Sequence, residues 1–134
     1  MDDTTMRDRF AAAEIARLAT VTEGALPHIV PCCFAVAGSV AYSAVDQKPK
    51  STRRLQRLAN LRAHPHAALL VDHYDDDWRT LWWIRADGAG RVVDDAGESE
   101  RAIELLVAKY HQYRTARPAG PVIAVELTRW SAWP

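Results

Sequence analysis

The chain has 134 residues, and its 17 basic and 17 acidic side chains give a formal net charge of zero. This length predicts one domain, residues 1–134, that buries roughly two thirds of its surface on folding. Zero net charge argues against nucleic-acid binding, which normally requires a surplus of positive charge. No apolar run approaches the roughly 20 residues of a membrane span. The opening MDDTTMRDRF lacks the apolar region of a signal peptide, so we expect a cytoplasmic protein.

The first predicted element is a short helix over residues 5–15, where Met6, Phe10 and Ala13 recur at helical spacing. Three strands follow within RLATVTEGALPHIVPCCFAVAGSVAYSAV, and turn residues at 23–24 and 37–39 join them as two hairpins. Hairpins make neighbouring strands antiparallel, because a parallel pair needs a long crossover. The pattern therefore argues against a parallel nucleotide-binding sheet.

The second half alternates between helices and strands in the same way. Residues 51–62 form an amphipathic helix that Pro65 closes, and residues 94–113 form another. Between them we expect strands in AALLVDHY, in WRTLWWIRA and at 89–93, with a turn at Asp87-Gly88, and VIAVELTRW is the last strand. Six or seven antiparallel strands satisfy their edges most simply by rolling up. The predicted fold class is mainly β, a small barrel flanked by helices.

Neither the cysteines nor the histidines predict a metal site. Cys32 and Cys33 are adjacent, so in a strand they point to opposite faces and form no unstrained disulfide. His64, His66 and His73 have no cysteine or carboxylate at a convincing ligand spacing. We expect two small buried thiols and no metal.

The most unusual feature is the basic segment VDQKPKSTRRLQRLANLRAHP, residues 45–65. No acidic residue occurs between Asp46 and Asp72. The segment carries six cations, Lys48, Lys50, Arg53, Arg54, Arg57 and Arg62. One interpretation is a solvated helix face, but such faces usually mix charges of both signs. The other is an anion site, because Ser51 can cap the helix and leave its first amides free for phosphate or carboxylate oxygens.

Several motifs together resemble a known family. RLATVT, PHIVP, YSAVDQKPK, LANLRAHP, LLVDHY and WWIRADGAGRV resemble the flavin and deazaflavin oxidoreductases of the pyridoxamine 5′-phosphate oxidase-like split β-barrel superfamily over nearly the whole chain. KPK, VDHYDDDW and LWWIRADG resemble its actinobacterial subgroup that depends on coenzyme F420. The substrate motifs of true pyridoxamine phosphate oxidases are not matched, so the resemblance does not imply vitamin B6 oxidation.

The resemblance implies a homodimer with cofactor sites at the subunit interface. The cofactor phosphate would be held by Lys48, Lys50 and Ser51, with Arg53, Arg54 or Arg57 behind them. The ring would lie near Pro31, Cys32, Cys33, Ser43 and Val45, and the partner's Trp78, Trp82 and Trp83 would close the pocket. No catalytic residue is implied. Tyr42, His73, Tyr74 and His111 are possible proton donors, each more typical of a structural role.

The choice of cofactor stays open between coenzyme F420 and FMN, because both carry the same phosphate. Six cations exceed the need of one phosphate and favour the charged tail of F420. The expected reaction is then hydride transfer to a small unsaturated or conjugated acceptor. The alternatives are an FMN-dependent oxidase or reductase, or a protein that binds flavin, deazaflavin or haem without turnover.

Overall fold

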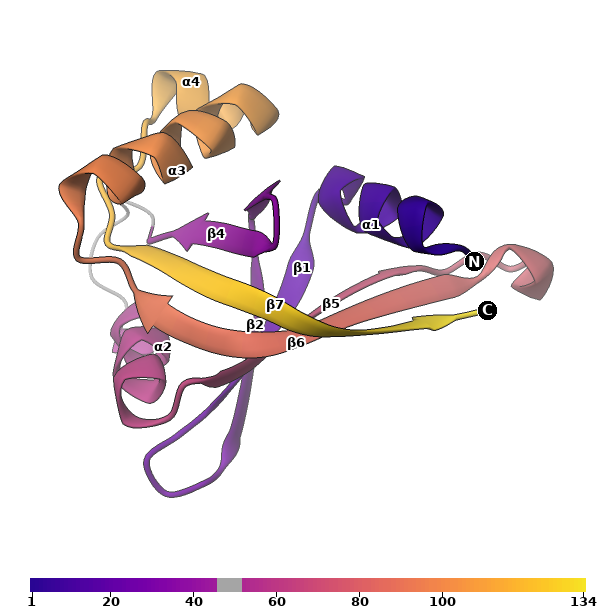
Figure 1. Cartoon of the computed structure of the whole chain (residues 1–134), viewed down its shortest axis with the longest axis horizontal. Coiled ribbons are helices and arrows are strands. Elements are labelled where there is room, and N and C mark those ends of the chain that lie inside the picture. The colour runs from indigo at the N-terminus through magenta and orange to yellow at the C-terminus, as the bar shows by residue number, and fades with distance from the viewer. Residues whose placement is uncertain (46–51) are drawn as a thin grey trace.

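The computed structural model describes residues 1–45 and 52–134, and of residues 52–55 it describes only the backbone. Helices and strands alternate along the chain (Figure 1). The elements are α1 (Asp3–Ala12), β1 (Ala16–Val21), β2 (Pro27–Cys32), β3 (Ala35–Ala37), β4 (Val40–Ala44), α2 (Thr52–Ala63), β5 (His66–His73), the 3-10 helix η1 (Trp78–Thr80), β6 (Trp82–Val92), α3 (Ala96–Lys109), α4 (Gln112–Thr115) and β7 (Val122–Trp133).

The strands form one curled antiparallel sheet in the order β2-β1-β5-β6-β7-β4-β3. β2 and β3 are the two edges of this sheet, yet only Cys33 and Phe34 separate them in the sequence. The three residue steps from Cys32 to Ala35 span at most about 11 Å, so the sheet must roll until its edges nearly meet. The fold is therefore a split β-barrel with flanking helices, and the predicted fold class is confirmed.

The core fills the rolled sheet and is closed by α1. Phe10 of α1 is completely buried and packs edge-to-face against Phe34 and Trp130, with ring centroids 5.2 and 5.0 Å away. Aromatic pairs in this geometry stabilise a core by about 0.5–1.5 kcal/mol beyond their buried area. A second core cluster, which includes Ile103 and Leu106, joins α3 to β4 and β7. α1 and α3 thus hold the strands of the sheet in place.

The amphipathic helix predicted at residues 51–62 is confirmed as α2. Leu58 and Leu61 are buried as the helical spacing requires. Asn60 is also buried, and its amide donates to Oγ1 of Thr20 at 3.0 Å, while Gln56 donates to Oδ1 of Asn60 at 2.6 Å. These bonds fix α2 against β1.

The prediction of a turn at Asp87-Gly88 is wrong, because β6 runs without interruption through both residues. The pairing of β6 with β7 changes register between them, which marks a β-bulge. A Cβ atom on Gly88 would lie only 1.8 Å from the carbonyl oxygen of Glu126. Glycine is needed there for the close approach of two strands, and local sequence cannot distinguish that need from a turn.

Other boundaries also differ from the expectation. The long second strand divides at Cys33 and Phe34, where the chain crosses between the sheet edges. Trp78 lies in η1 and not in a strand. The helix predicted at residues 94–113 is α3, which begins after Asp95 and ends at Lys109. The Asp95 carboxylate caps the helix by accepting a hydrogen bond from the amide of Glu98 at 2.7 Å. No helix in the described residues is long and apolar enough to cross a membrane.

Candidate functional site

A groove of about 300 Å³ opens where the ends of β2 and β4 meet α2 and α4. β4 ends at Ala44, so the groove lies where the chain enters the basic segment. We call it the Arg57 groove. Its lining residues are Ile15, Pro31, Cys32, Cys33, Ser43, Ala44, Arg57 and Tyr113.

Arg57 gives this groove its chemical character. Its side chain extends from α2 into the lining, and its Nε is buried without a hydrogen-bond partner among the described residues. A buried donor that bonds to nothing costs about 1–3 kcal/mol, and more when the group is charged. Such a donor in a groove wall indicates a ligand that supplies an acceptor oxygen or nitrogen.

Cys32 and Cys33 meet the groove in different ways. Cys32 is buried, and desolvation raises the pKa of its thiol to about 11, with opposing effects from the neighbouring Ser43 and Arg57. The Cys32 thiol therefore stays neutral at physiological pH and forms part of an uncharged wall. Cys33 is only half-buried and lies in the walls of two grooves. Among the described residues no three His, Cys, Asp or Glu side chains are clustered to hold a metal ion.

The structure brings together most of the residues expected around the cofactor ring. Pro31, Cys32, Cys33 and Ser43 all line the Arg57 groove. Val45, directly after β4, is not part of the groove lining and packs against the core. Its amide donates to the carbonyl of Pro121 at 2.9 Å. The expected phosphate ligands fall outside the part of the chain that is described: Lys48, Lys50 and Ser51, and the side chains of Arg53 and Arg54.

The three tryptophans are not near this groove in one copy of the chain. η1 and the start of β6 lie at the opposite end of the molecule from the end of β4 (Figure 1). Trp78 is 69% and Trp83 36% exposed. Trp82 faces the core, stacks on His73 with centroids 6.2 Å apart, and lies 5.4 Å below the guanidinium of Arg9. A partner subunit contributing these rings remains a prediction.

Ile15, Ala44 and Tyr113 also line the groove and were missed in the sequence. Ala44 follows Ser43 directly, but Ile15 and Tyr113 reach the groove only through tertiary packing. Of the possible proton donors, Tyr42 donates to Oε2 of Glu98 at 2.8 Å and is absent from the groove lining. His111 lines a neighbouring groove, described below.

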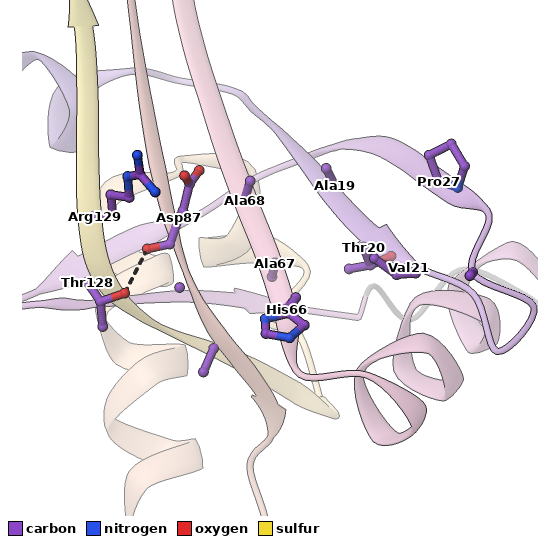
Figure 2. Close-up of a pocket in the computed structure, with 13 residues that line it drawn as sticks. Ala19, Thr20, Val21, Pro27, His66, Ala67, Ala68, Asp87, Thr128 and Arg129 are labelled. Carbon is purple, nitrogen blue, oxygen red and sulfur yellow. Dashed lines mark hydrogen bonds between the residues drawn. The ribbon is translucent and has the colours of Figure 1, made fainter.

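A larger hollow of about 730 Å³ lies across β1, β5, β6 and β7 (Figure 2). Small residues such as Ala19, Ala68 and Ala89 form much of its lining. Asp87 and Arg129 are cross-strand neighbours whose side chains rise together at its edge (Figure 2). The Asp87 carboxylate forms an ion pair with Nε of Arg85 at 2.8 Å. This hollow is broad and has no unpartnered buried donor in its described lining, so it fits a cofactor less well than the Arg57 groove.

Comparison with known proteins identifies the class that this barrel and groove define. The model of the pyridoxamine 5′-phosphate oxidase family matches residues 3–134, so the chain belongs to that family. No curated protein matches the sequence. The solved structures that resemble it include a conserved hypothetical protein from Mycobacterium tuberculosis, with a TM-score of 0.77 and 18% identity over 99% of this chain and 84% of that one.

Two further structures share the fold. A putative 5-nitroimidazole antibiotic resistance protein from Bacteroides thetaiotaomicron has a TM-score of 0.76 and 12% identity, covering 98% of this chain and 82% of that one. A FAD-binding protein from Mesorhizobium loti has a TM-score of 0.74 and 16% identity, covering 98% and 92%. At these identities the likeness establishes the split-barrel fold alone.

Proposed function

We propose that the chain is an oxidoreductase that uses coenzyme F420, bound in the Arg57 groove, to exchange a hydride with a small unsaturated or conjugated acceptor. The observation that carries the proposal is the buried Nε of Arg57 on α2, which has no hydrogen-bond partner among the described residues and lies in a groove at the end of β4. This donor is suited to a cofactor with a heteroaromatic ring whose edge carries hydrogen-bond acceptors.

The lining fits such a ring. Pro31, Ala44 and Ile15 offer apolar contact, while Arg57 and Ser43 offer donors. When bound, the cofactor supplies the hydride chemistry. The phosphate is expected at Lys48, Lys50 and Ser51, directly after the groove in the sequence.

The protein's own contribution is position and the exclusion of water. Holding two reactants in a productive geometry lowers a barrier by several kcal/mol, at most about 7–11. The groove walls come from β2, β4 and α2. The hydrogen bond from Asn60 to Thr20 holds α2 against β1, the strand that pairs with β2. A rigid groove of this kind orients a planar ring without having to reorganise.

The six cations of the basic segment favour F420 over FMN, because its tail carries further negative charge beyond the phosphate. FMN is the second candidate, and the FAD-binding name of one structural neighbour supports a flavin in general. Haem is less well supported. Among the described lining residues there is no histidine to act as an axial ligand, and the raised pKa of Cys32 disfavours a thiolate.

We also propose that two copies of the chain pair through the outer face of the sheet. Ile29 is 63% exposed, and Trp83 and Trp133 are exposed cross-strand neighbours on β6 and β7. An interface on this face would remove these exposed apolar side chains from water. Pairing would bring tryptophans of one copy to the groove of the other. Sedimentation of wild type and Ile29→Lys tests this: a dimer that dissociates in the variant supports it, and a wild-type monomer contradicts it.

Titration of the pure protein with coenzyme F420, FMN and haem, followed by fluorescence and absorbance, tests the cofactor. We expect the tightest binding for F420, and consumption of its reduced form when conjugated acceptors are added. Lys50→Ala should weaken binding without loss of fold. Tighter binding of FMN selects the second candidate, and binding of haem alone contradicts both.

A further inference from the structure

A second groove, of about 650 Å³, adjoins the Arg57 groove and shares Ile15, Cys33 and Tyr113 with it. It lies between the end of α1, the crossing from β2 to β3, and the corner between α3 and α4. We call it the Lys109 groove. Its other lining residues are Ala12, Glu14, Lys109, Tyr110, His111 and Gln112.

Lys109 is a half-buried cation in the wall of this groove. Its ammonium donates to the carbonyls of Ala11 at 2.9 Å and Phe34 at 2.8 Å and lies 3.9 Å from the centre of the Phe34 ring. Desolvation lowers its pKa to about 8, against the smaller opposing effects of Cys33, Cys32 and Glu14. No carboxylate among the described residues forms an ion pair with it.

A structural role alone does not require a charge at this position. The hydroxyl of Tyr110 already bonds to the Phe34 amide at 2.9 Å, so a neutral group holds the same crossing. Burying a cation is costly unless an opposite charge compensates it. An ammonium has three N–H groups: two suffice for the carbonyls, and a ligand oxygen can compete with the Phe34 ring for the third. A desolvated cation in the wall of a roomy groove therefore indicates an anion.

We propose that the Lys109 groove binds the organic acceptor, and that this acceptor carries a carboxylate conjugated to its reducible bond. This rests on the proposed function, because the shared wall at Cys33 places the groove next to the one assigned to the ring. Lys109 binds the carboxylate, and the remainder of the acceptor extends toward Cys33. The residue is a binding and orienting group for the acceptor, and no proton transfer is assigned to it.

The charges around Lys109 set the expected pH dependence. Glu14 on the α1–β1 connection opposes an anion. The other titratable side chains of the lining are those of Cys33, Tyr110, His111 and Tyr113. Cys32 is not part of this lining but is close enough to raise the pKa of Lys109 slightly. Because the ammonium loses its proton as the pH rises past about 8, carboxylate binding should weaken between pH 7 and pH 9.5.

The probe for this site is trans-cinnamate, which has a carboxylate conjugated to a double bond, compared with its neutral analogue cinnamamide. Calorimetric titration of the cofactor-free protein at pH 7 should give binding of cinnamate at least about tenfold tighter than that of cinnamamide, as expected for a charge-assisted hydrogen bond. Lys109→Met should abolish the difference and Lys109→Arg should retain most of it. Glu14→Gln should tighten cinnamate binding.

Equal affinity for the two probes in the wild type, or weaker cinnamate binding in Glu14→Gln, would overturn the proposal even if Lys109→Met fails to fold. These measurements need no cofactor. A protein that binds F420 but does not prefer cinnamate refutes the acceptor site alone, whereas preference for cinnamate without cofactor binding refutes the proposed function alone.

Discussion

The hydroxyl of Tyr110 accepts a hydrogen bond from the backbone amide of Phe34 at 2.9 Å and donates to the carbonyl of Glu14 at 2.7 Å. Phe34 stands where the chain passes between the two edges of the sheet, so its amide lies outside the strand ladders. Burial raises the pKa of Tyr110 well above its ordinary value, and its hydroxyl therefore stays protonated. The side chain of Tyr110, the residue directly after α3, thus holds the crossing between the two sheet edges, which we call the seam of the barrel.

Tyr110→Phe removes this hydroxyl and leaves a half-buried amide without its partner. We expect the free energy of unfolding to fall by about 1–3 kcal/mol, measured by urea denaturation. Tyr74→Phe is the matched control, because Tyr74 is 70% exposed and should change stability by less than about 0.5 kcal/mol. Equal effects of the two variants would show that the seam does not depend on Tyr110.

Gly88→Ala tests the bulge between β6 and β7. The new Cβ would lie 1.8 Å from the Glu126 carbonyl oxygen, so one strand must move. We expect a loss of more than about 2 kcal/mol in the free energy of unfolding, as strain of this kind commonly costs. At Gly24 the nearest atom to such a Cβ is 4.0 Å away, so Gly24→Ala should have little effect. A wild-type melting temperature for Gly88→Ala would refute the close approach.

Glu98 links stability to pH. Its carboxylate accepts hydrogen bonds from Arg91 at 2.8 and 2.7 Å and from Tyr42 at 2.8 Å, which lower its pKa from 4.5 to about 2. A depressed carboxyl pKa gives stability that is complete above pH 4.5 and is lost as the pH falls toward 2.

Glu98→Gln should therefore lower the melting temperature at pH 7 by about 5–9 °C, because a charge-assisted bond contributes about 1.5–3 kcal/mol and each kcal/mol shifts a domain of this size by about 3 °C. It should also flatten the fall in melting temperature between pH 4.5 and pH 2. Glu23→Gln, in the exposed loop between β1 and β2, is the control and should keep the wild-type profile. Parallel profiles of Glu98→Gln and wild type would argue against the network.

Arg57→Met tests the donor in the candidate cofactor groove. It removes the charge and keeps an unbranched apolar side chain, so the fold should persist. We expect the Kd for the cofactor to rise at least about tenfold, because a bond to a charged donor contributes about 1.5–3 kcal/mol. Arg101→Met, on the exposed face of α3, should leave the Kd unchanged. Fluorescence titration measures both, and equal Kd values would remove Arg57 from the site.

The parts of the fold that follow from local periodicity could be predicted. Leu58 and Leu61 repeat at helical spacing, and α2 is where they place it. The parts that depend on distant contacts could not. Asp87-Gly88 has the composition of a turn, and only the position of Glu126 on a neighbouring strand makes it a bulge.

The residues of the candidate site also fall into a group that the sequence identifies and a group that only tertiary packing reveals. Pro31 to Cys33 and Ser43 could be named from family resemblance, because they lie on, or directly after, strands that the motifs identify. Tyr113 on α4 and Ile15 in the connection between α1 and β1 enter the groove only through tertiary packing. The burial of Lys109 is visible only in three dimensions.

Protection of Cys33 from alkylation tests the location of the cofactor most directly. Cys33 is half-buried in the groove wall, whereas Cys32 is buried and should react little. Iodoacetamide labelling, followed by mass spectrometry, should slow at Cys33 by at least about tenfold when coenzyme F420 saturates the protein, because the thiol loses its access to solvent. An unchanged rate at Cys33 in protein shown by fluorescence to be saturated would place the cofactor elsewhere and contradict the account.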